Sequence, residues 1–137
     1  MAHTSYDKYL ETEVLTADPL KLVNMLYRAA IEAVEAARRH LASGEIRERS
    51  RKITKAWEIV HELRRSLDDQ HGVDLTRQLR GLYAYVQGRL LEANAQQADA
   101  PLAEAERILK TLLEGWSAAH AAAAAAVEQD EPVICLP

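Results

Sequence analysis

The segment from residue 20 to residue 41 constrains the fold most, because it is apolar around most of its circumference. On a helical wheel at about 100° per residue, its apolar side chains form two neighbouring arcs. The first arc contains Leu20, Val23, Tyr27, Ala30, Ile31, Val34, Ala37 and Leu41. The second arc contains Leu22, Met25, Leu26, Ala29, Ala33 and Ala36. Together they span roughly 240°, whereas a surface helix needs about 100° or slightly more, so this helix is predicted either to lie between neighbours in a bundle or to offer one arc to another chain.

Composition favours a single domain built from helices. The chain has 137 residues, of which 48% are hydrophobic and 28% are charged, as is typical of one folded globular domain. Alanine and leucine are abundant and phenylalanine is absent. Because alanine and leucine side chains lose little conformational freedom in a helix, the predicted fold class is all-α.

Helix start and stop signals divide the chain into helical segments. Asp18 followed by Pro19 is typical of a helix entrance, since aspartate accepts hydrogen bonds from free amides and proline suits the first helical position. Asp99 and Pro101 repeat this signal, and Gly44 is typical of a helix end. The predicted helices cover about residues 19–42, 46–69, 74–97 and 101–127. Because the connections are short, neighbouring helices must run antiparallel, which predicts an antiparallel up-down four-helix bundle.

Both ends of the chain differ from the helical segments. Residues 1–17 precede the first helix and carry apolar side chains that must pack somewhere, namely Tyr6, Tyr9, Leu10 and Val14. We expect this segment to act as a flap on the bundle and to complete a bundle domain of residues 1–127. Residues 128–137 are acidic and then bounded by prolines, so they are predicted to form a disordered tail.

Charge and cysteine content argue against several classes of protein. The formal net charge is −4 and the basic residues form no long cluster, so a nucleic acid partner is not expected. No uncharged apolar run of about 20 residues is present, so insertion into a membrane is not expected either. The first residues lack the basic and apolar pattern of a secretion signal, and Cys135 has no second cysteine for a disulfide. We therefore expect a cytoplasmic protein.

Catalytic and metal-binding patterns are absent except for one incomplete pair. Glu58 and His61 have the spacing of half of a carboxylate-bridged di-iron site, but no second such pair exists, so His61 is predicted to be an ordinary boundary residue. No phosphate loop, nucleophile elbow or Cys and His arrangement is present, so the sequence predicts no enzyme, no catalytic residue, no cofactor and no metal. Gly81 and Gly88 lie within the third predicted helix, where they fit either the close approach of another helix or tolerated surface positions.

An ordered set of residues along the chain resembles one known family. The set begins with Tyr9, Val14, Thr16, Ala17, Asp18, Pro19, Leu22, Val23, Met25, Leu26 and Tyr27. It continues with Lys55, Ala56, Ile59, Glu62, Leu63, Ser66, Leu67, Asp68, Leu82, Tyr83, Ala93, Asn94 and Trp116. These residues are similar in order and spacing to the flagellar secretion chaperone FliS family over about residues 5–120. Two features depart from the family: Arg28 and Ala29 stand where an acid and a glycine are common, and the tail after Ala121 has no counterpart.

The resemblance implies a helical bundle that binds the disordered C-terminal region of flagellin in the cytoplasm. It further implies that the protein prevents premature polymerisation of flagellin and assists its delivery to the flagellar type III secretion apparatus. Flagellin and the export apparatus are thus the expected partners.

The helical wheel, and not the family, suggests where flagellin would bind. The expected groove consists of Leu22, Met25, Leu26, Ala29 and Ala33. We expect the flap to cover part of this groove when no client is bound. The alternative is a structural module in which the same arc forms the interface of a homodimer and no client exists. A weak homodimer that dissociates when the client is added would still agree with the chaperone hypothesis.

Overall fold

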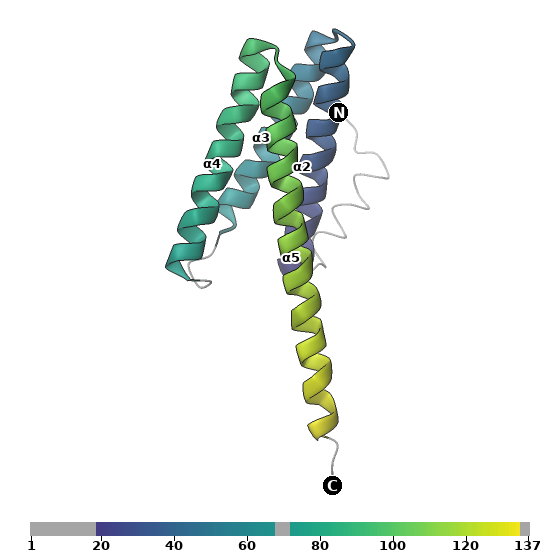
Figure 1. Ribbon diagram of the computed structural model, residues 1–137, viewed down its shortest axis with the longest axis vertical. Coiled ribbons are helices and arrows are strands. Elements are labelled where there is room, and N and C mark those ends of the chain that lie inside the picture. Colours follow the sequence, from purple (N-terminus) through teal and green to yellow (C-terminus); the bar gives the residue numbers. More distant parts are fainter. Residues whose placement is uncertain (1–18, 68–71, 135–137) are drawn as a thin grey trace, which may run out of the picture.

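A computed structural model shows an all-α protein and describes residues 19–67 and 72–134 (Figure 1). Its helices are α2 (Pro19–Ala42), α3 (Ile46–Arg65), α4 (Val73–Gln96) and α5 (Asp99–Ile134). Each helix packs against the next in the chain, and α5 also packs against α2, so the helices form a closed ring. Neighbours run antiparallel, which confirms the predicted up-down bundle.

The helix boundaries follow the backbone chemistry of the turns. Gly44 has a φ of 70°, in the left-handed region that glycine tolerates, and it separates α2 from α3 at the predicted stop. Helix α3 ends at Arg65, before the predicted 69, where the hydroxyl of Ser66 donates a hydrogen bond of 3.0 Å to the carbonyl of Leu63. The side chain of Ser66 thus binds the last turn, as serine commonly does at helix ends.

The core contains the middle of the first apolar arc of α2. Tyr27, Ala30, Val34 and Ala37 of the first arc are fully buried, together with apolar residues of the other helices. The hydroxyl groups of Tyr27 and Tyr83 are hydrogen-bonded inside this core, and the two rings lie 6.3 Å apart between their centroids. A buried hydroxyl needs such a partner because an unpaired polar group in the core is costly.

The last helix is longer than predicted. It begins at Asp99 and continues past the predicted end at 127 to Ile134, projecting beyond the other helices (Figure 1). Alanine has the highest helix propensity of the amino acids, so the run from Ala121 to Ala126 favours a helical backbone even where α5 extends beyond the other helices (Figure 1). The predicted disordered tail therefore differs from the structure over 128–134, whose backbone continues α5, while 135–137 lie outside the described residues.

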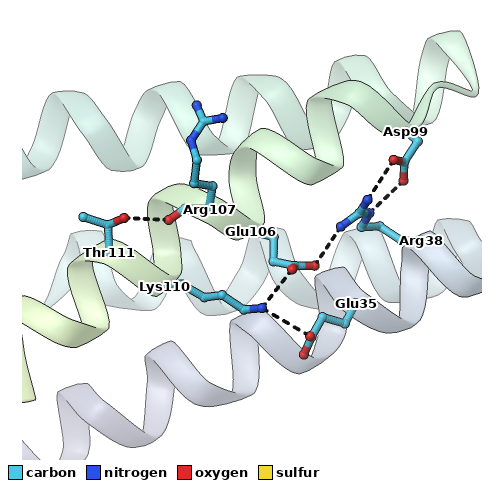
Figure 2. A network of polar contacts seen from close by, with 7 residues as sticks. All are labelled: Glu35, Arg38, Asp99, Glu106, Arg107, Lys110 and Thr111. Atoms are coloured by element: carbon cyan, nitrogen blue, oxygen red, sulfur yellow. Dashed lines mark hydrogen bonds and ion pairs between the residues drawn. The ribbon is translucent and has the colours of Figure 1, made fainter.

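Polar contacts join α5 to one side of α2 (Figure 2). The guanidinium of Arg38 binds both carboxylate oxygens of Asp99 at 2.8 and 2.9 Å and reaches Glu106 at 3.3 Å. Lys110 binds Glu106 at 3.0 Å and Glu35 at 3.6 Å. The carboxylate of Asp99, at the first residue of α5, thus also binds α2, because Arg38 offers it a bidentate, charge-assisted pair.

The glycines of α4 lie on the outside of the bundle. A Cβ atom added at Gly81 or at Gly88 would meet no atom within 4 Å. No other described helix therefore approaches these positions closely, and among the described residues both glycines are exposed.

Candidate functional site

A groove of about 580 Å³ lies along α2, beside α3. Its α2 lining includes the small or flexible apolar side chains Met25, Ala29, Ala33 and Ala36. Small side chains leave space above the helix backbone, so the groove follows directly from the spacing of these alanines along α2.

The structure brings together only part of the predicted groove. Met25, Ala29 and Ala33 are among the residues that line the groove, whereas Leu22 and Leu26 are not, and the binding of flagellin at these residues stays a prediction. Leu26 is half-buried and packs against the core cluster, and Ala33 is only 4% exposed. The second apolar arc of α2 is therefore divided: one part packs inside the bundle, and the other part lines the groove.

The predicted flap cannot be placed against this groove. Tyr6, Tyr9, Leu10 and Val14 all lie outside the described residues, and so does Asp18, the predicted cap of the first helix. The flap therefore stays a prediction.

Sequence reasoning did not identify the polar rims of the groove. On α2 the rim consists of Arg28, Glu32, Glu35 and Arg39. On α3 it consists of Lys52 and Lys55. The α2 rim could have been found, since these residues form the polar stripe next to the apolar arc. The α3 rim could not, because the sequence does not give the register of α3 against α2.

The rims carry more positive than negative charge. Arg28, Arg39, Lys52 and Lys55 take part in none of the ion pairs found among the described residues. The carboxylate of Glu35 is already bound by Lys110 of α5. The groove can thus offer an apolar floor together with cationic groups that have no partner within the described part of the chain.

Nothing in the described residues gives this groove catalytic or metal chemistry. Within residues 19–67 and 72–134, no group of three or more His, Cys, Asp or Glu side chains could hold a metal ion. The ring of His61 is stacked on Trp57, with centroids 5.1 Å apart and planes 7° from parallel, while Glu58 is exposed. Among the same residues, no helix is both long and apolar enough to cross a membrane.

Comparison with known proteins decides the family. A family model described as "Flagellar protein FliS" matches residues 1–123. The chain belongs to the FliS family. This membership confirms the resemblance seen in the sequence and places the protein among chaperones, not enzymes.

Named FliS relatives match most of the chain. "Flagellar secretion chaperone FliS" of Salmonella typhimurium is 32% identical over 108 residues, which are 78% of this chain and 80% of the relative. "Flagellar secretion chaperone FliSB" of Pseudomonas aeruginosa is 33% identical over 107 residues, covering 78% of this chain and 85% of the relative. The FliS protein of Bacillus subtilis is 26% identical over 114 residues, with 83% and 84% covered.

A solved structure supports the FliS fold. The "Crystal structure of flagellar chaperone from bacteria" superposes with a TM-score of 0.71 and covers 84% of this chain and 94% of that chain. Its sequence identity of 19% makes this a likeness of fold alone. The match to the FliS family model ends at 123, so the last part of α5 lies beyond it.

Proposed function

We propose that this FliS-family protein is an export chaperone that binds the disordered C-terminal region of flagellin in the cytoplasm. Bound in this way, flagellin is kept from premature polymerisation and delivered to the flagellar type III secretion apparatus. The observation that carries the proposal is the groove beside α2, whose lining includes Met25 and Ala29, both of them only half-buried among the described residues.

The shape of the groove suits a helix of the client. Alanines let a second helix approach closely, and an amphipathic helix can bury its apolar stripe in such a groove. Half-buried Leu26 supports this wall of α2 from the core side. Leu22 is also half-buried, at the end of the same arc, where it extends the apolar surface towards the start of α2.

Binding of a disordered segment explains both parts of the proposed activity. A segment that folds on binding buries its apolar residues on the chaperone, so those residues are no longer available for contacts with other flagellin molecules. The same segment is released when a stronger partner competes for it. A chaperone of this kind therefore needs a groove that binds reversibly and no catalytic group.

The N-terminal segment is proposed to regulate access. We assign Tyr6, Tyr9, Leu10 and Val14 to a flap that covers the groove when flagellin is absent. A flap lowers the apparent affinity by the fraction of time for which it is closed. It also shields apolar surface that would otherwise invite association.

The proposal is tested by mixing the protein with flagellin that carries or lacks its last several dozen residues. Size exclusion chromatography should show a one-to-one complex only with the intact flagellin. The absence of a complex with intact flagellin, or an equal complex with the truncated form, would contradict the proposal. A tight dimer that does not depend on concentration and binds no flagellin would indicate the structural module instead.

A further inference from the structure

The charge of the groove is opposite to that of the whole chain. The formal net charge of the protein is −4. The groove nevertheless has four cationic side chains on its rims, Arg28, Arg39, Lys52 and Lys55. None of them forms an ion pair with another described residue. A local excess of unpaired positive charge around an apolar floor is the electrostatic complement of an acidic partner.

The acidic residues of the groove do not cancel this charge. Glu35 lies on the same rim, but its carboxylate binds Lys110 at 3.6 Å (Figure 2). Glu32 is the one other carboxylate that lines the groove. The rims therefore keep an excess of positive charge after every ion pair of the described residues has been counted.

The two rims differ in a way that gives an occupant a direction. The α3 rim carries only cations, because Lys52 and Lys55 lie one helical turn apart on the same face. On the α2 rim, Arg28 and Arg39 bracket the two glutamates along the helix. An occupant thus meets uninterrupted positive charge on the α3 side alone.

We infer that the flagellin segment in the groove is an amphipathic helix with carboxylates on the flank that faces α3. Its apolar stripe lies on the alanine floor, and acidic residues three or four positions apart pair with Lys52 and Lys55. Arg28 and Arg39 pair with further carboxylates of the client near the two ends of the stripe. This inference rests on the proposed function, because it takes flagellin as the occupant.

Ion pairs at the rim of an interface act mainly on the rate of association and on salt dependence. They are solvent-exposed, so salt screens them over a distance of about 10 Å at 0.1 M ionic strength. We therefore expect the affinity for the client to fall as salt is added. Binding through burial of apolar surface alone would instead be strengthened or unchanged by salt.

The test compares two charge reversals that change the net charge equally. K52E/K55E reverses the α3 rim, whereas R77E/R80E reverses two exposed arginines of α4 that have the same spacing and no ion-pair partner among the described residues. Affinity for flagellin is measured by calorimetry at about 0.05 M and about 0.5 M salt. Circular dichroism establishes that both variants fold, and K52Q/K55Q serves as a milder replacement if K52E/K55E does not.

K52E/K55E should weaken binding at low salt on the order of tenfold and abolish most of its salt dependence, while R77E/R80E should change affinity less than about threefold. Equal effects of the two variants would overturn the inference, because they would reflect the net charge and not the rim. Unchanged binding by K52E/K55E would overturn it as well, and would leave the proposed function intact.

Two designed helical peptides separate a failure of the inference from a failure of the proposed function. Both carry the same leucine stripe, and one has glutamates and the other has lysines on the flank. The glutamate peptide should bind the wild-type protein better than the lysine peptide does, and K52E/K55E should reverse this preference. If wild-type protein fails to bind flagellin but shows this preference, the proposed function falls and the acidic character of the occupant stands. Equal binding of both peptides would overturn the inferred occupant. A salt-sensitive homodimer of the wild-type protein that K52E/K55E abolishes would also overturn it, because a second copy of the chain would then occupy the groove.

Discussion

The indole nitrogen of Trp116 donates a hydrogen bond of 2.9 Å to the hydroxyl of Tyr27, which also bonds to the hydroxyl of Tyr83. These residues come from α5, α2 and α4, so one polar cluster joins three helices of the bundle. Tyr27 occupies the middle of this cluster, because it contacts both of the other side chains.

The first prediction concerns the loss of this shared hydroxyl. Replacing Tyr27 with Phe leaves the hydroxyl of Tyr83 and the indole nitrogen of Trp116 without this partner. Because an unsatisfied buried polar group is costly, the free energy of unfolding should fall by about 1–3 kcal/mol. Urea denaturation measures the change, and Tyr85→Phe is the control, since Tyr85 is 48% exposed. An equal loss in the two variants would contradict the role of the cluster.

The same cluster predicts a loss of stability at alkaline pH. Burial raises the pKa of Tyr27 well above its usual value of 10.0, and burial also raises the pKa of Tyr83. A raised pKa in the folded state means that its stabilisation is complete below the pKa of the unfolded tyrosine and is lost as the pH rises towards the folded pKa. The free energy of unfolding should therefore decline from about pH 10 upwards. In Tyr27→Phe, the free energy of unfolding should decline less steeply with pH. The same slope in the variant and the wild type would contradict a contribution of Tyr27 to the pH dependence.

How far the sequence predicts this fold depends on whether a feature is local to one helix. Periodicity correctly places Tyr27, Ala30, Val34 and Ala37 in the core, because a fixed rotation per residue puts them on one face of α2. Gly44 correctly marks a helix end for an equally local reason. Helix α5 continues past the end predicted at 127, because the helix propensity of the alanine run outweighs the acidic residues and prolines that follow it.

Features that depend on the register between two helices were not predicted. The pairing of Arg38 with Asp99 joins residues far apart in sequence, and nothing near either residue indicates it. Lys52 and Lys55 were missed for the same reason, since their place at the groove depends on how α3 packs against α2. A helical wheel likewise predicts which residues of α2 are apolar, but it does not predict which of them face the core and which line the groove. Leu26 packs against the core, whereas Ala29 lines the groove.

A third prediction concerns the ion pair that joins α2 to α5. Hydrogen bonding from Arg38 lowers the pKa of Asp99 below its usual value of 3.8. With a lowered pKa, the contribution to stability is present above the unfolded value and is lost as the pH falls through the folded value. The Asp99 side chain is 50% exposed, so Asp99→Asn should lower stability near neutral pH by only about 0.2–1 kcal/mol.

Denaturation at about pH 7 and about pH 3 tests this ion pair. The difference in stability between wild type and Asp99→Asn should shrink at the lower pH, because Asp99 takes up a proton in the unfolded state before it does so in the folded state. Asp74→Asn is the control, since Asp74 is exposed and forms no ion pair with the described residues. A difference that stays constant with pH would show that the charge of Asp99 does not contribute.

A fourth prediction separates binding from folding in the groove. Ala29 is half-buried and lines the groove, so Ala29→Trp should fill it without entering the core. Affinity for flagellin should fall by at least about tenfold, which corresponds to about 1.4 kcal/mol, while the thermal unfolding midpoint should change little. Ala84→Trp is the matched control, because Ala84 is exposed on α4 outside the groove. Wild-type affinity in Ala29→Trp would place the client elsewhere.

The last prediction concerns the flap, which contains Tyr6, Tyr9, Leu10 and Val14. A flap that covers the groove about 90% of the time weakens apparent binding about tenfold. Replacing residues 1–15 with a single methionine should therefore tighten flagellin binding by up to about tenfold, because the client no longer competes with the flap. Removal of residues 128–137 is the control and should leave the affinity unchanged. Calorimetry that finds the same affinity with and without residues 1–15 would show that these residues do not occupy the groove, and weaker binding without them would assign them to the contact with flagellin.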